Sequence, residues 1–282
     1  MGMGMNADNA AAMYPDFRAA GRFRKSWQCC VPGFDAVLRD LRSMPAGELE
    51  DGNHQLINVS SGKYVYSCQC GGWKFAYKTQ LGKTFWRYMF RPSLPWREAL
   101  HYSWLHELGV PAPRVLALGD TRVSFVLKES FIITEFLAQT HDGRIFMPKG
   151  QFRTGYEDLC REFCIGNLKL LAKVHDAGYF HKASHPRNFL FRGDTPESME
   201  IFWIDVARMR KMSDPRRAVI VDLHTFFRDM RLPQTQVHEL IGIYLQCLQK
   251  KLFNSSEELL QELINFKRRR FSRRKYKLFD CD

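Results

Sequence analysis

Four groups of residues in this 282-residue chain have the types and the order needed to handle a phosphoryl group. Lys78 ends the strand-like stretch Phe75-Ala76-Tyr77-Lys78, in the manner of strands whose lysine pairs with nucleotide phosphates. Glu98 follows twenty residues later, near the start of a helical pattern. A lysine in such a site needs a carboxylate to hold its ammonium group, and a glutamate from the next helix supplies one. We therefore predict an ion pair between Lys78 and Glu98, both as candidate catalytic residues.

The third and fourth groups follow a long helical pattern in the second half of the chain. In the run His181-Lys182-Ala183-Ser184-His185-Pro186-Arg187-Asn188 the first histidine and the asparagine are seven positions apart, as in the H-R-D-L-x-x-x-N catalytic loop. Asp205 ends the next apolar run, where the aspartate of a D-F-G motif would lie, although Val206 and Ala207 replace the phenylalanine and glycine. Amide and carboxylate oxygens suit Mg²⁺, so Asn188 and Asp205 are candidate metal ligands.

Two features expected of such a site are missing. The turn Ser60-Ser61-Gly62-Lys63 has one glycine where a loop that covers phosphates is rich in them. Ala183 occupies the position of the catalytic aspartate, and a methyl group neither accepts a proton nor orients a hydroxyl. Because the transition state of phosphoryl transfer is loose, positioning and charge neutralisation contribute more than a base does. His181 and His185 are candidate replacements, although loop histidines are more often structural.

The elements around these groups change character near the middle of the chain. The first half predicts three short antiparallel strands, one helix from about Ser93 to Leu108, and two or three further strands with a turn at Gly119-Asp120. The second half predicts mainly helices and one hairpin. These elements cover Gln55–Val59, Tyr64–Gln69 and Trp73–Thr79 as strands, Tyr156–Ala177, Ala218–Met230 and Gln236–Lys250 as helices, a hairpin over 189–204, and a last helix opened by the capping box Ser255-x-x-Glu258.

This pattern predicts an α+β fold with a small β-rich lobe that carries one helix, followed by a larger helical lobe. We divide the chain into an N-terminal extension over 1–50, a small lobe over 51–138, a large lobe over 139–266 and a basic tail over 267–282. Within the extension, the apolar segment Phe34–Leu38 is expected to form a helix that packs onto the next part of the chain.

Two further stretches are more specific than the four groups. The run Phe90-Arg91-Pro92-Ser93-Leu94-Pro95-Trp96-Arg97-Glu98-Ala99 and the run Leu105-x-x-Leu108-Gly109-Val110-Pro111-Ala112-Pro113 resemble bacterial lipopolysaccharide core kinases, the Kdo and heptose kinase family. His175-x-x-Gly178-Tyr179-Phe180-His181-Lys182 and Ile204-Asp205-x-x-Arg208 are similar to that family's catalytic and metal regions. The resemblance covers about residues 55 to 230 and implies a bilobal protein-kinase-like fold.

The resemblance also implies an activity and a set of roles. The activity is phosphorylation of a sugar hydroxyl on the lipopolysaccharide inner core or a related anionic glycolipid, with ATP and Mg²⁺ as cofactors, in the cytoplasm at the inner face of the bacterial inner membrane. Lys78 would hold the α- and β-phosphates, and Asn188 and Asp205 would bind Mg²⁺. Glu135, Phe136 and Leu137 would form the hinge whose backbone meets adenine. Asp222 would brace the catalytic loop, or else be a helix cap or a surface residue.

The formal charge of +12 indicates an anionic partner. The stretch 83–91 mixes basic and aromatic residues, which suits an anionic membrane surface but also an ordinary connection between lobes. The stretch 267–277 has eight basic residues in eleven, which favours membrane adsorption over a nucleic-acid arm, because no folded nucleic-acid motif accompanies it. We expect no specific nucleic-acid partner, no secretory signal and no membrane span.

Two alternatives to an active glycolipid kinase remain open. The chain could be a kinase-like pseudoenzyme that binds nucleotide or glycolipid and regulates a partner, because Ala183 replaces the aspartate and the glycines are missing. It could also phosphorylate another small molecule or a protein, because a fold alone does not define a substrate.

Overall fold

The computed structural model describes residues 26–43, 53–60, 62–81, 92–123, 126–147 and 153–270, with backbone alone for Ser60 and residues 267–270. The chain divides into two compact units. The N-terminal unit comprises Met1–Trp104 and Pro113–Ala138, and the C-terminal unit comprises Leu105–Ala112 and Gln139–Asp282. The division into an extension, two lobes and a tail stays a prediction.

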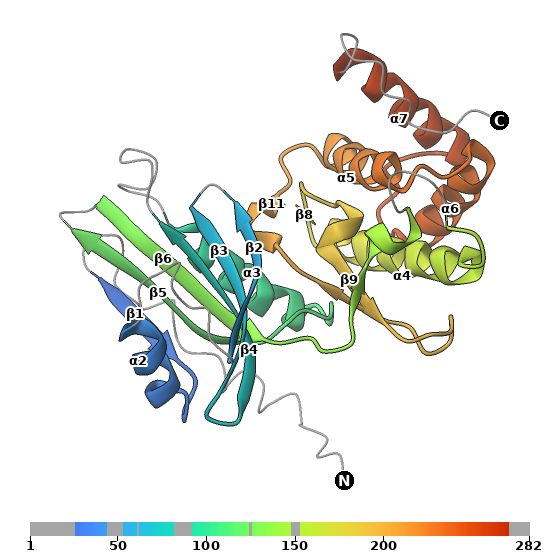
Figure 1. The fold of residues 1–282 in the computed structure, drawn as a ribbon. Coiled ribbons are helices and arrows are strands. Elements are labelled where there is room, and N and C mark those ends of the chain that lie inside the picture. Colours follow the sequence, from blue (N-terminus) through green and yellow to red (C-terminus); the bar gives the residue numbers. More distant parts are fainter. Residues whose placement is uncertain are drawn as a thin grey trace. The chain divides into compact units, whose positions relative to one another are not determined.

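A six-stranded antiparallel sheet forms the N-terminal unit, with the strand order β1-β5-β6-β4-β3-β2 (Figure 1). The three strands predicted between residues 55 and 79 are confirmed, and each is slightly longer than predicted. The strands are β1 (Trp27–Cys30), β2 (His54–Ser60), β3 (Lys63–Cys70), β4 (Trp73–Leu81), β5 (Val115–Val123) and β6 (Val126–Glu135).

The turn predicted at Gly119-Asp120 is wrong, because both residues lie inside β5 and pair with β1. A Cβ atom on Gly119 would lie 2.7 Å from the Trp27 carbonyl oxygen and 2.7 Å from the Phe131 ring. Glycine is therefore needed here for the close approach of β1 and not for a turn. Asp120 is accommodated inside the sheet by an ion pair with Arg122 at 2.9 Å.

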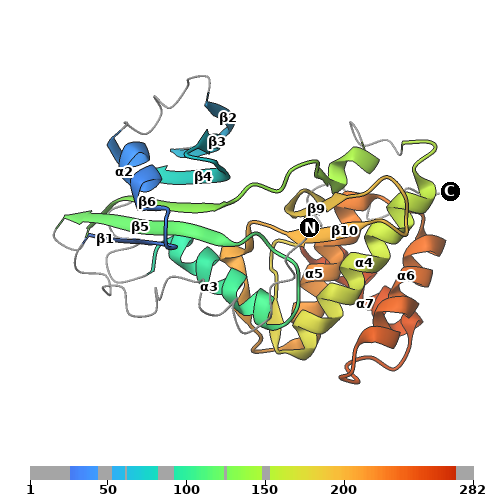
Figure 2. The same ribbon diagram turned by 90° about the horizontal axis from the view of Figure 1, so that it is seen from below.

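Two helices, α2 (Asp35–Ser43) and α3 (Leu94–Glu107), lie on opposite faces of this sheet (Figure 2). Neighbouring residues of a strand point to opposite faces, and Tyr77 and Lys78 of β4 follow this rule. Tyr77 belongs to the core cluster that contains the buried apolar residues of α2, whereas Lys78 contacts Glu98 of α3. The helix predicted around Phe34–Leu38 is thus present as α2, and it packs on the sheet face away from Lys78.

Helices dominate the C-terminal unit, and short strands and 3-10 turns connect them (Figure 1). The predicted long helix and the predicted hairpin are both confirmed, as α4 and as the antiparallel pair β9–β10. The elements are β7 (His141–Asp142), η2 (Gly143–Phe146), α4 (Glu157–Asp176), β8 (Tyr179–Phe180), η4 (Pro186–Asn188), β9 (Phe189–Arg192), β10 (Glu200–Trp203), η5 (Val206–Arg208), β11 (Arg210–Lys211), α5 (Pro215–Met230), α6 (Gln234–Cys247) and α7 (Ser256–Arg270).

An aromatic core holds the C-terminal unit together. The rings of Phe146, Phe163 and Phe191 contact one another with centroids 5.2 to 5.5 Å apart. Phe189 and Phe226 extend the cluster, with centroids 5.9 Å apart. Because Phe189 and Phe191 belong to β9, this core fixes the strand that directly follows residues 181–188.

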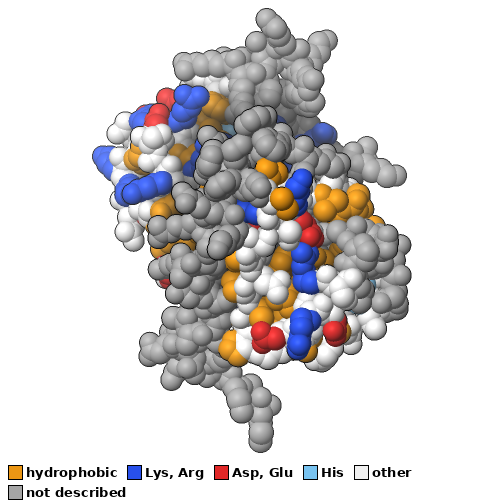
Figure 3. Space-filling view, turned by 90° about the vertical axis from the view of Figure 1, so that its left-hand side faces the viewer, with side chains coloured by type: hydrophobic (Ala, Val, Ile, Leu, Met, Phe, Trp, Pro, Cys, Tyr) orange, Lys and Arg blue, Asp and Glu red, His pale blue; other side chains and the backbone are white. Residues whose placement is uncertain are grey.

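Few large hydrophobic side chains are exposed in the part of the chain that the structure describes. Among the described residues, the large hydrophobic side chains that are exposed are Ile57, Val59 and Val123. On the face drawn in Figure 3, hydrophobic side chains are interspersed with Lys and Arg and do not form one continuous patch. Within the described parts of the chain, none of the helices has the length and apolar character needed to cross a membrane.

Candidate functional site

The N-terminal unit contains the predicted contact between Lys78 and Glu98. Lys78 Nζ lies 2.7 Å from Glu98 Oε1, and the side chains are 26% and 7% exposed. A buried carboxylate needs partners to offset the loss of its hydration. Tyr102, one turn further along α3, donates its hydroxyl to the same Glu98 oxygen at 2.8 Å. Glu98 is therefore held by two contacts, and the partly exposed ammonium group of Lys78 has a fixed position from which it can meet an anion.

The hinge predicted at Glu135, Phe136 and Leu137 begins at the last residue of β6. The Glu135 carboxylate accepts hydrogen bonds from the Arg114 backbone N–H and from Arg114 Nε, both at 2.9 Å. The Phe136 N–H donates to the Lys74 carbonyl at 3.2 Å, and Lys74 Nζ lies 4.6 Å from the centre of the Phe136 ring. Arg114 occupies the Glu135 side chain, and the backbone N–H groups of Glu135 and Phe136 already donate within the N-terminal unit. Recognition of adenine at this segment would therefore fall to the other backbone groups.

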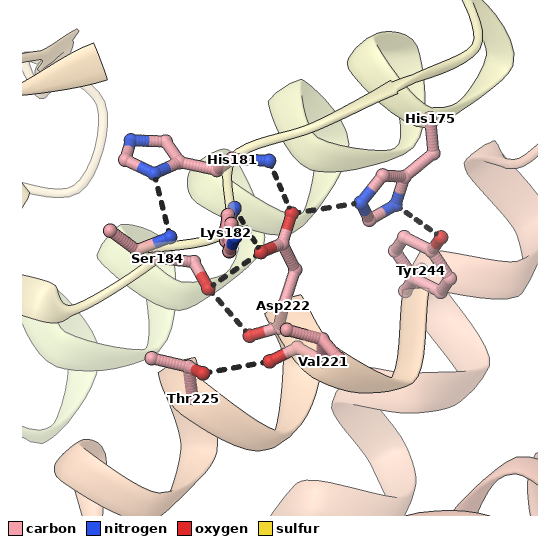
Figure 4. Close-up of polar contacts among 9 residues, drawn as sticks. His175, His181, Lys182, Ser184, Val221, Asp222, Thr225 and Tyr244 are labelled. Carbon is pink, nitrogen blue, oxygen red and sulfur yellow. Dashed lines mark hydrogen bonds and ion pairs between the residues drawn. The ribbon is translucent and has the colours of Figure 1, made fainter. Parts of the chain in front are cut away.

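In the C-terminal unit, Asp222 of α5 fixes the loop formed by residues 181–188 (Figure 4). Its carboxylate accepts the backbone N–H of His181 at 2.6 Å and that of Lys182 at 2.7 Å. The Ser184 hydroxyl donates to the Asp222 carbonyl at 2.7 Å. Asp222 is completely buried, so the surface alternative is wrong and the predicted bracing of the loop is confirmed.

A second layer of contacts holds Asp222 itself (Figure 4). His175 Nε2 lies 3.2 Å from the Asp222 carboxylate, and His175 Nδ1 lies 2.7 Å from the Tyr244 hydroxyl. Burial raises the pKa of Tyr244 well above its usual value, so the hydroxyl keeps its proton. Tyr244 can then donate to Nδ1 while Nε2–H donates to Asp222, and this order of donors fixes the imidazole tautomer.

His181, one of the two predicted substitutes for a catalytic base, is buried. Its ring packs against Phe189 and Trp203 with centroids 5.4 and 5.3 Å apart, and Nδ1 accepts the Ala183 N–H at 3.3 Å. Burial lowers the pKa of His181 to about 4, and the nearby Asp222 charge opposes that shift only in part. Among the described residues, His181 Nε2 has no hydrogen-bond partner. His181 is therefore neutral near pH 7 and turned away from solvent.

His185 differs from His181 in being partly exposed, at 22% of its side chain. Its Nδ1 lies 2.7 Å from Asp229 of α5, and Arg228 Nε donates to the other oxygen of that carboxylate at 2.7 Å. Burial alone would raise the pKa of Asp229, but the hydrogen bonds from His185 and Arg228 outweigh it and lower the pKa. In the neutral imidazole, Asp229 favours the tautomer with its proton on Nδ1, and Nε2 is the acceptor nitrogen of that tautomer.

The two candidate metal ligands lie on adjacent segments of the C-terminal unit. Asn188 Nδ2 donates to the Ala183 carbonyl at 2.7 Å, which orients the amide and leaves Oδ1 as its ligand atom. The Ile204 N–H donates to the Asn188 carbonyl at 2.9 Å, which places Asp205 one residue beyond that contact. Asp205 is exposed and has left-handed backbone angles, φ 53° and ψ 44°. A non-glycine residue held there is typical of functional sites, and two oxygen donors fit Mg²⁺.

Parts of the predicted site lie outside the described residues. The basic and aromatic stretch 83–91 does so entirely, and so does Ser61 of the turn that would cover phosphates. Of the stretch 267–277, only the backbone of residues 267–270, at the end of α7, is described.

Residues 65–244 match the model of the lipopolysaccharide kinase (Kdo/WaaP) family. The chain belongs to this family. The matched range includes the Lys78–Glu98 pair, the loop 181–188, Asp205 and Asp222. The predicted family resemblance is therefore confirmed, and it includes every residue for which a catalytic, nucleotide-binding or metal-binding role was predicted.

Two individual proteins show how far the similarity extends. Lipopolysaccharide core heptose(I) kinase WaaP from Pseudomonas aeruginosa PAO1 is 29% identical over 145 residues, which are 51% of this chain and 49% of that protein. The alignment thus spans about half of the relative's length. A solved structure described as WaaP in complex with acyl carrier protein has a TM-score of 0.64 at 18% identity, over 90% of this chain and all of that chain. This likeness confirms the predicted α+β, protein-kinase-like fold.

In this member of the Kdo/WaaP family, three side chains were missed in the sequence analysis. Tyr102 follows Glu98 by four positions, which is the spacing of helix neighbours and was a usable signal. Asp229 follows Asp222 by seven positions, so both carboxylates lie on one face of α5 two turns apart. Tyr244 contacts His175, which lies 69 positions earlier in the sequence, and no local sequence pattern predicts that contact.

Proposed function

We propose that this chain transfers the γ-phosphoryl group of ATP to a hydroxyl of a sugar in the lipopolysaccharide inner core, or in a related anionic glycolipid. In this reaction the hydroxyl oxygen forms a bond to the γ-phosphorus, the bond to the bridging oxygen of ADP breaks, and the hydroxyl proton is released. Family membership supports the reaction class. The observation that carries the proposal is the Lys78–Glu98 pair at 2.7 Å, within the matched range that also contains the braced loop.

The residues have separate roles in this proposal. Lys78 holds the α- and β-phosphates, and Glu98 holds Lys78. The backbone at Glu135, Phe136 and Leu137 binds adenine. Asn188 and Asp205 would hold Mg²⁺, which neutralises phosphate charge when it is bound.

The hydroxyl needs an orienting group because Ala183 supplies none. His185 is better placed than His181 for this task, since it is partly exposed and Asp229 leaves its Nε2 as an acceptor. His181 is buried between aromatic rings and holds the loop in shape. We therefore assign the hydrogen bond from the sugar hydroxyl to His185, and a positioning role to Asp229.

The proposed place of action is the cytoplasmic face of the bacterial inner membrane, with the protein bound peripherally. The acceptor is a glycolipid of that membrane, and the basic stretches 83–91 and 267–277 suit an anionic surface. No nucleic-acid partner is part of the proposal.

Phosphate transfer to purified core oligosaccharide, with the new phosphate located by mass spectrometry, tests the proposal. Lys78→Met and Asp205→Ala should each lower the rate by at least about 10²-fold, because charge stabilisation supplies most of the acceleration. Lys128→Met is the matched control, since Lys128 is an exposed lysine on β6 of the same sheet. Transfer that survives both substitutions would contradict the assignment.

The pseudoenzyme alternative rests on two observations, the methyl group of Ala183 in place of the aspartate and the missing glycines of the turn 60–63. It predicts that the chain binds ATP or core oligosaccharide by calorimetry but transfers no more phosphate than the Asp205→Ala variant does. A transfer rate well above that of the Asp205→Ala variant excludes the pseudoenzyme alternative.

A further inference from the structure

Five basic side chains surround the loop that carries Asn188, and the proposed phosphate transfer uses none of them. We call them the loop cations: Lys182, Arg187, Arg208, Arg210 and Lys211. We propose that the loop cations bind an anionic substituent, a phosphate or a carboxylate, of the acceptor glycolipid and so select an acceptor that is already charged. This inference rests on the proposed function, because it assigns the acceptor side of that same reaction.

The fold exposes these cations while burying most of the residues beside them. Lys182 and Arg187 are exposed, although most of the loop around them is buried. Arg208, Arg210 and Lys211 are also exposed. Their apolar neighbours Val206, Ala207 and Met209 are buried and anchor this segment. The alternation fixes the backbone and turns the charges toward solvent.

Backbone hydrogen bonds hold the two cation-bearing segments side by side. Strand β11 pairs antiparallel with β8, so Arg210 lies opposite Phe180, two residues before Lys182. At the other end of the loop, the Ile204 N–H donates to the Asn188 carbonyl, next to Arg187, at 2.9 Å. The loop and the segment 204–211 are therefore joined at both ends, and the cations of both segments belong to one surface of the C-terminal unit.

Four of the loop cations differ in their pairing from several arginines of the same unit. Within the described residues, Arg187, Arg208, Arg210 and Lys211 form no ion pair with a carboxylate. By contrast, several other arginines of this unit are paired: Arg144 with Asp142, Arg161 with Glu239, Arg192 with Glu200, Arg216 with Glu258 and Arg228 with Asp229. Four cations without a carboxylate partner among the described residues therefore lie on the loop and on the segment beside it.

The local sequence also has more basic than acidic residues. The stretches 181–188 and 205–211 together contain five Lys or Arg residues and one acidic residue, Asp205. Like charges held this close repel one another, and an anionic ligand would relieve that repulsion. Guanidinium groups favour phosphate and carboxylate because they can donate two parallel hydrogen bonds. Since the acceptor hydroxyl must approach the loop at His185, an anion elsewhere on the acceptor is the ligand that reaches these side chains.

Steady-state kinetics on two acceptors test the proposal. One acceptor is the phosphorylated core oligosaccharide, and the other is the same oligosaccharide after chemical removal of its phosphates with the Kdo carboxylates reduced to alcohols. The double variant Arg210→Gln, Lys211→Gln should raise the KM for the charged acceptor roughly tenfold or more, while the KM for ATP stays constant. The neutral acceptor should show no difference between the variant and the unsubstituted protein.

Arg161→Gln is the matched control, because Arg161 is exposed on α4 but already paired with Glu239. Arg208→Gln is a second test that leaves β11 intact, and it should raise the same KM. An unchanged KM in both loop-cation variants, an equal loss on the neutral acceptor, or a rise in the KM for ATP alone would overturn the proposal.

Direct binding separates this inference from the proposed function. If no core acceptor is phosphorylated by the unsubstituted protein, the proposed function fails, and calorimetry with the charged oligosaccharide in the absence of ATP still tests the loop cations. Weaker binding by the Arg210→Gln, Lys211→Gln variant supports the role proposed for the loop cations, and binding equal to that of the unsubstituted protein overturns it. A last experiment measures the binding of both proteins to phosphatidylglycerol vesicles that contain no glycolipid. If the variant loses vesicle binding but not oligosaccharide binding, the ligand is a membrane headgroup and the assignment to the acceptor is wrong.

Discussion

At the scale of single residues, the loop 181–188 is organised around an alanine. Ala183 offers only its backbone: its N–H donates to His181 Nδ1 and its carbonyl accepts from Asn188 Nδ2. A loop with these contacts keeps its shape without a carboxylate at position 183. The chemical deficit is therefore confined to the missing hydrogen-bond acceptor, a role that the proposed function gives to His185 with Asp229 as its positioning residue.

His181 makes the stability of the fold depend on pH. Its pKa is about 4 in the fold against an ordinary value of 6.5, so the unfolded chain binds the proton more readily. Stability is then fully present above about pH 6.5 and is lost as the pH falls toward 4, by up to roughly 3 kcal/mol. We expect His181→Phe to remove most of this loss, because phenylalanine fits between the same rings without a titrating group.

Denaturant unfolding at several pH values between 7 and 4 measures the effect. The unsubstituted chain should lose more of its free energy of unfolding over this range than His181→Phe does. Exposed His141 on β7 provides the control, and His141→Phe should retain the full loss. Equal losses in all three proteins would show that the burial of His181 does not cause the pH dependence of the free energy of unfolding.

At the scale of elements, three helices determine the conformation of the loop. Asp222 of α5 binds the backbone of His181 and Lys182, and Tyr244 of α6 acts on Asp222 through His175 of α4. Three helices therefore meet at one carboxylate, all of it buried. A change at Tyr244 should reach the loop although Tyr244 contacts none of its residues in this network.

We expect Tyr244→Phe to lower kcat several-fold with little change in the KM for ATP. Loss of the hydroxyl removes the hydrogen bond that orients the His175 ring, and the hydrogen bonds of Asp222 to the loop backbone become weaker. The expected cost in stability is about 1–2 kcal/mol. Hydrogen exchange at the His181 and Lys182 amides should become faster in step with the loss of kcat. Tyr156→Phe is the control, because the Tyr156 side chain forms no capping hydrogen bond at the start of α4. Slower turnover with unchanged exchange at both amides would place the effect of Tyr244 elsewhere.

The sequence was sufficient for the elements whose pattern is local. Periodicity predicted β2 to β4, α3, α4 and the β9–β10 hairpin, and the spacing of charged residues predicted the Lys78–Glu98 contact. Prediction from the sequence failed where packing between distant parts of the chain determines the structure. Gly119 was interpreted as a turn, but it is a point of close approach to β1. The four-residue strand β1 has too little pattern to be recognised before its partner strand is known.

The site shows the same division between local and long-range information. Asn188 and Asp205 follow from motif spacing within the chain. The contact between Tyr244 and His175 joins residues that are 69 positions apart, and the contact between His185 and Asp229 joins residues 44 apart. Such pairs depend on how the helices pack, which the side-chain pattern of either helix leaves undetermined.

At the scale of the whole molecule, the charge of +12 is unevenly distributed along the chain. Residues 267–282 contain eight basic and two acidic side chains and so carry half of it. Among the residues of α7 whose side chains are described, the buried hydrophobic ones are Leu259, Leu260 and Leu263, and all three precede this segment. Removing residues 267–282 should therefore leave the packing of α7 on the C-terminal unit intact and take away only the concentrated charge.

Deletion of residues 267–282 should weaken binding to vesicles that contain anionic lipid, and it should reduce the salt dependence of that binding. Each basic residue near such a surface contributes about 1 kcal/mol, so the loss should exceed tenfold in vesicle affinity while the affinity for ATP stays nearly constant. Co-sedimentation with vesicles and calorimetry with ATP measure the two quantities. A tail of the same composition in scrambled order is the control and should bind as the natural tail does, because the attraction between a cluster of charges and a charged surface depends on the charge and not on the order of the residues. If vesicle binding is unchanged by the deletion, or if ATP binding is lost with it, the division of the charge between a catalytic body and a membrane-contacting tail is wrong.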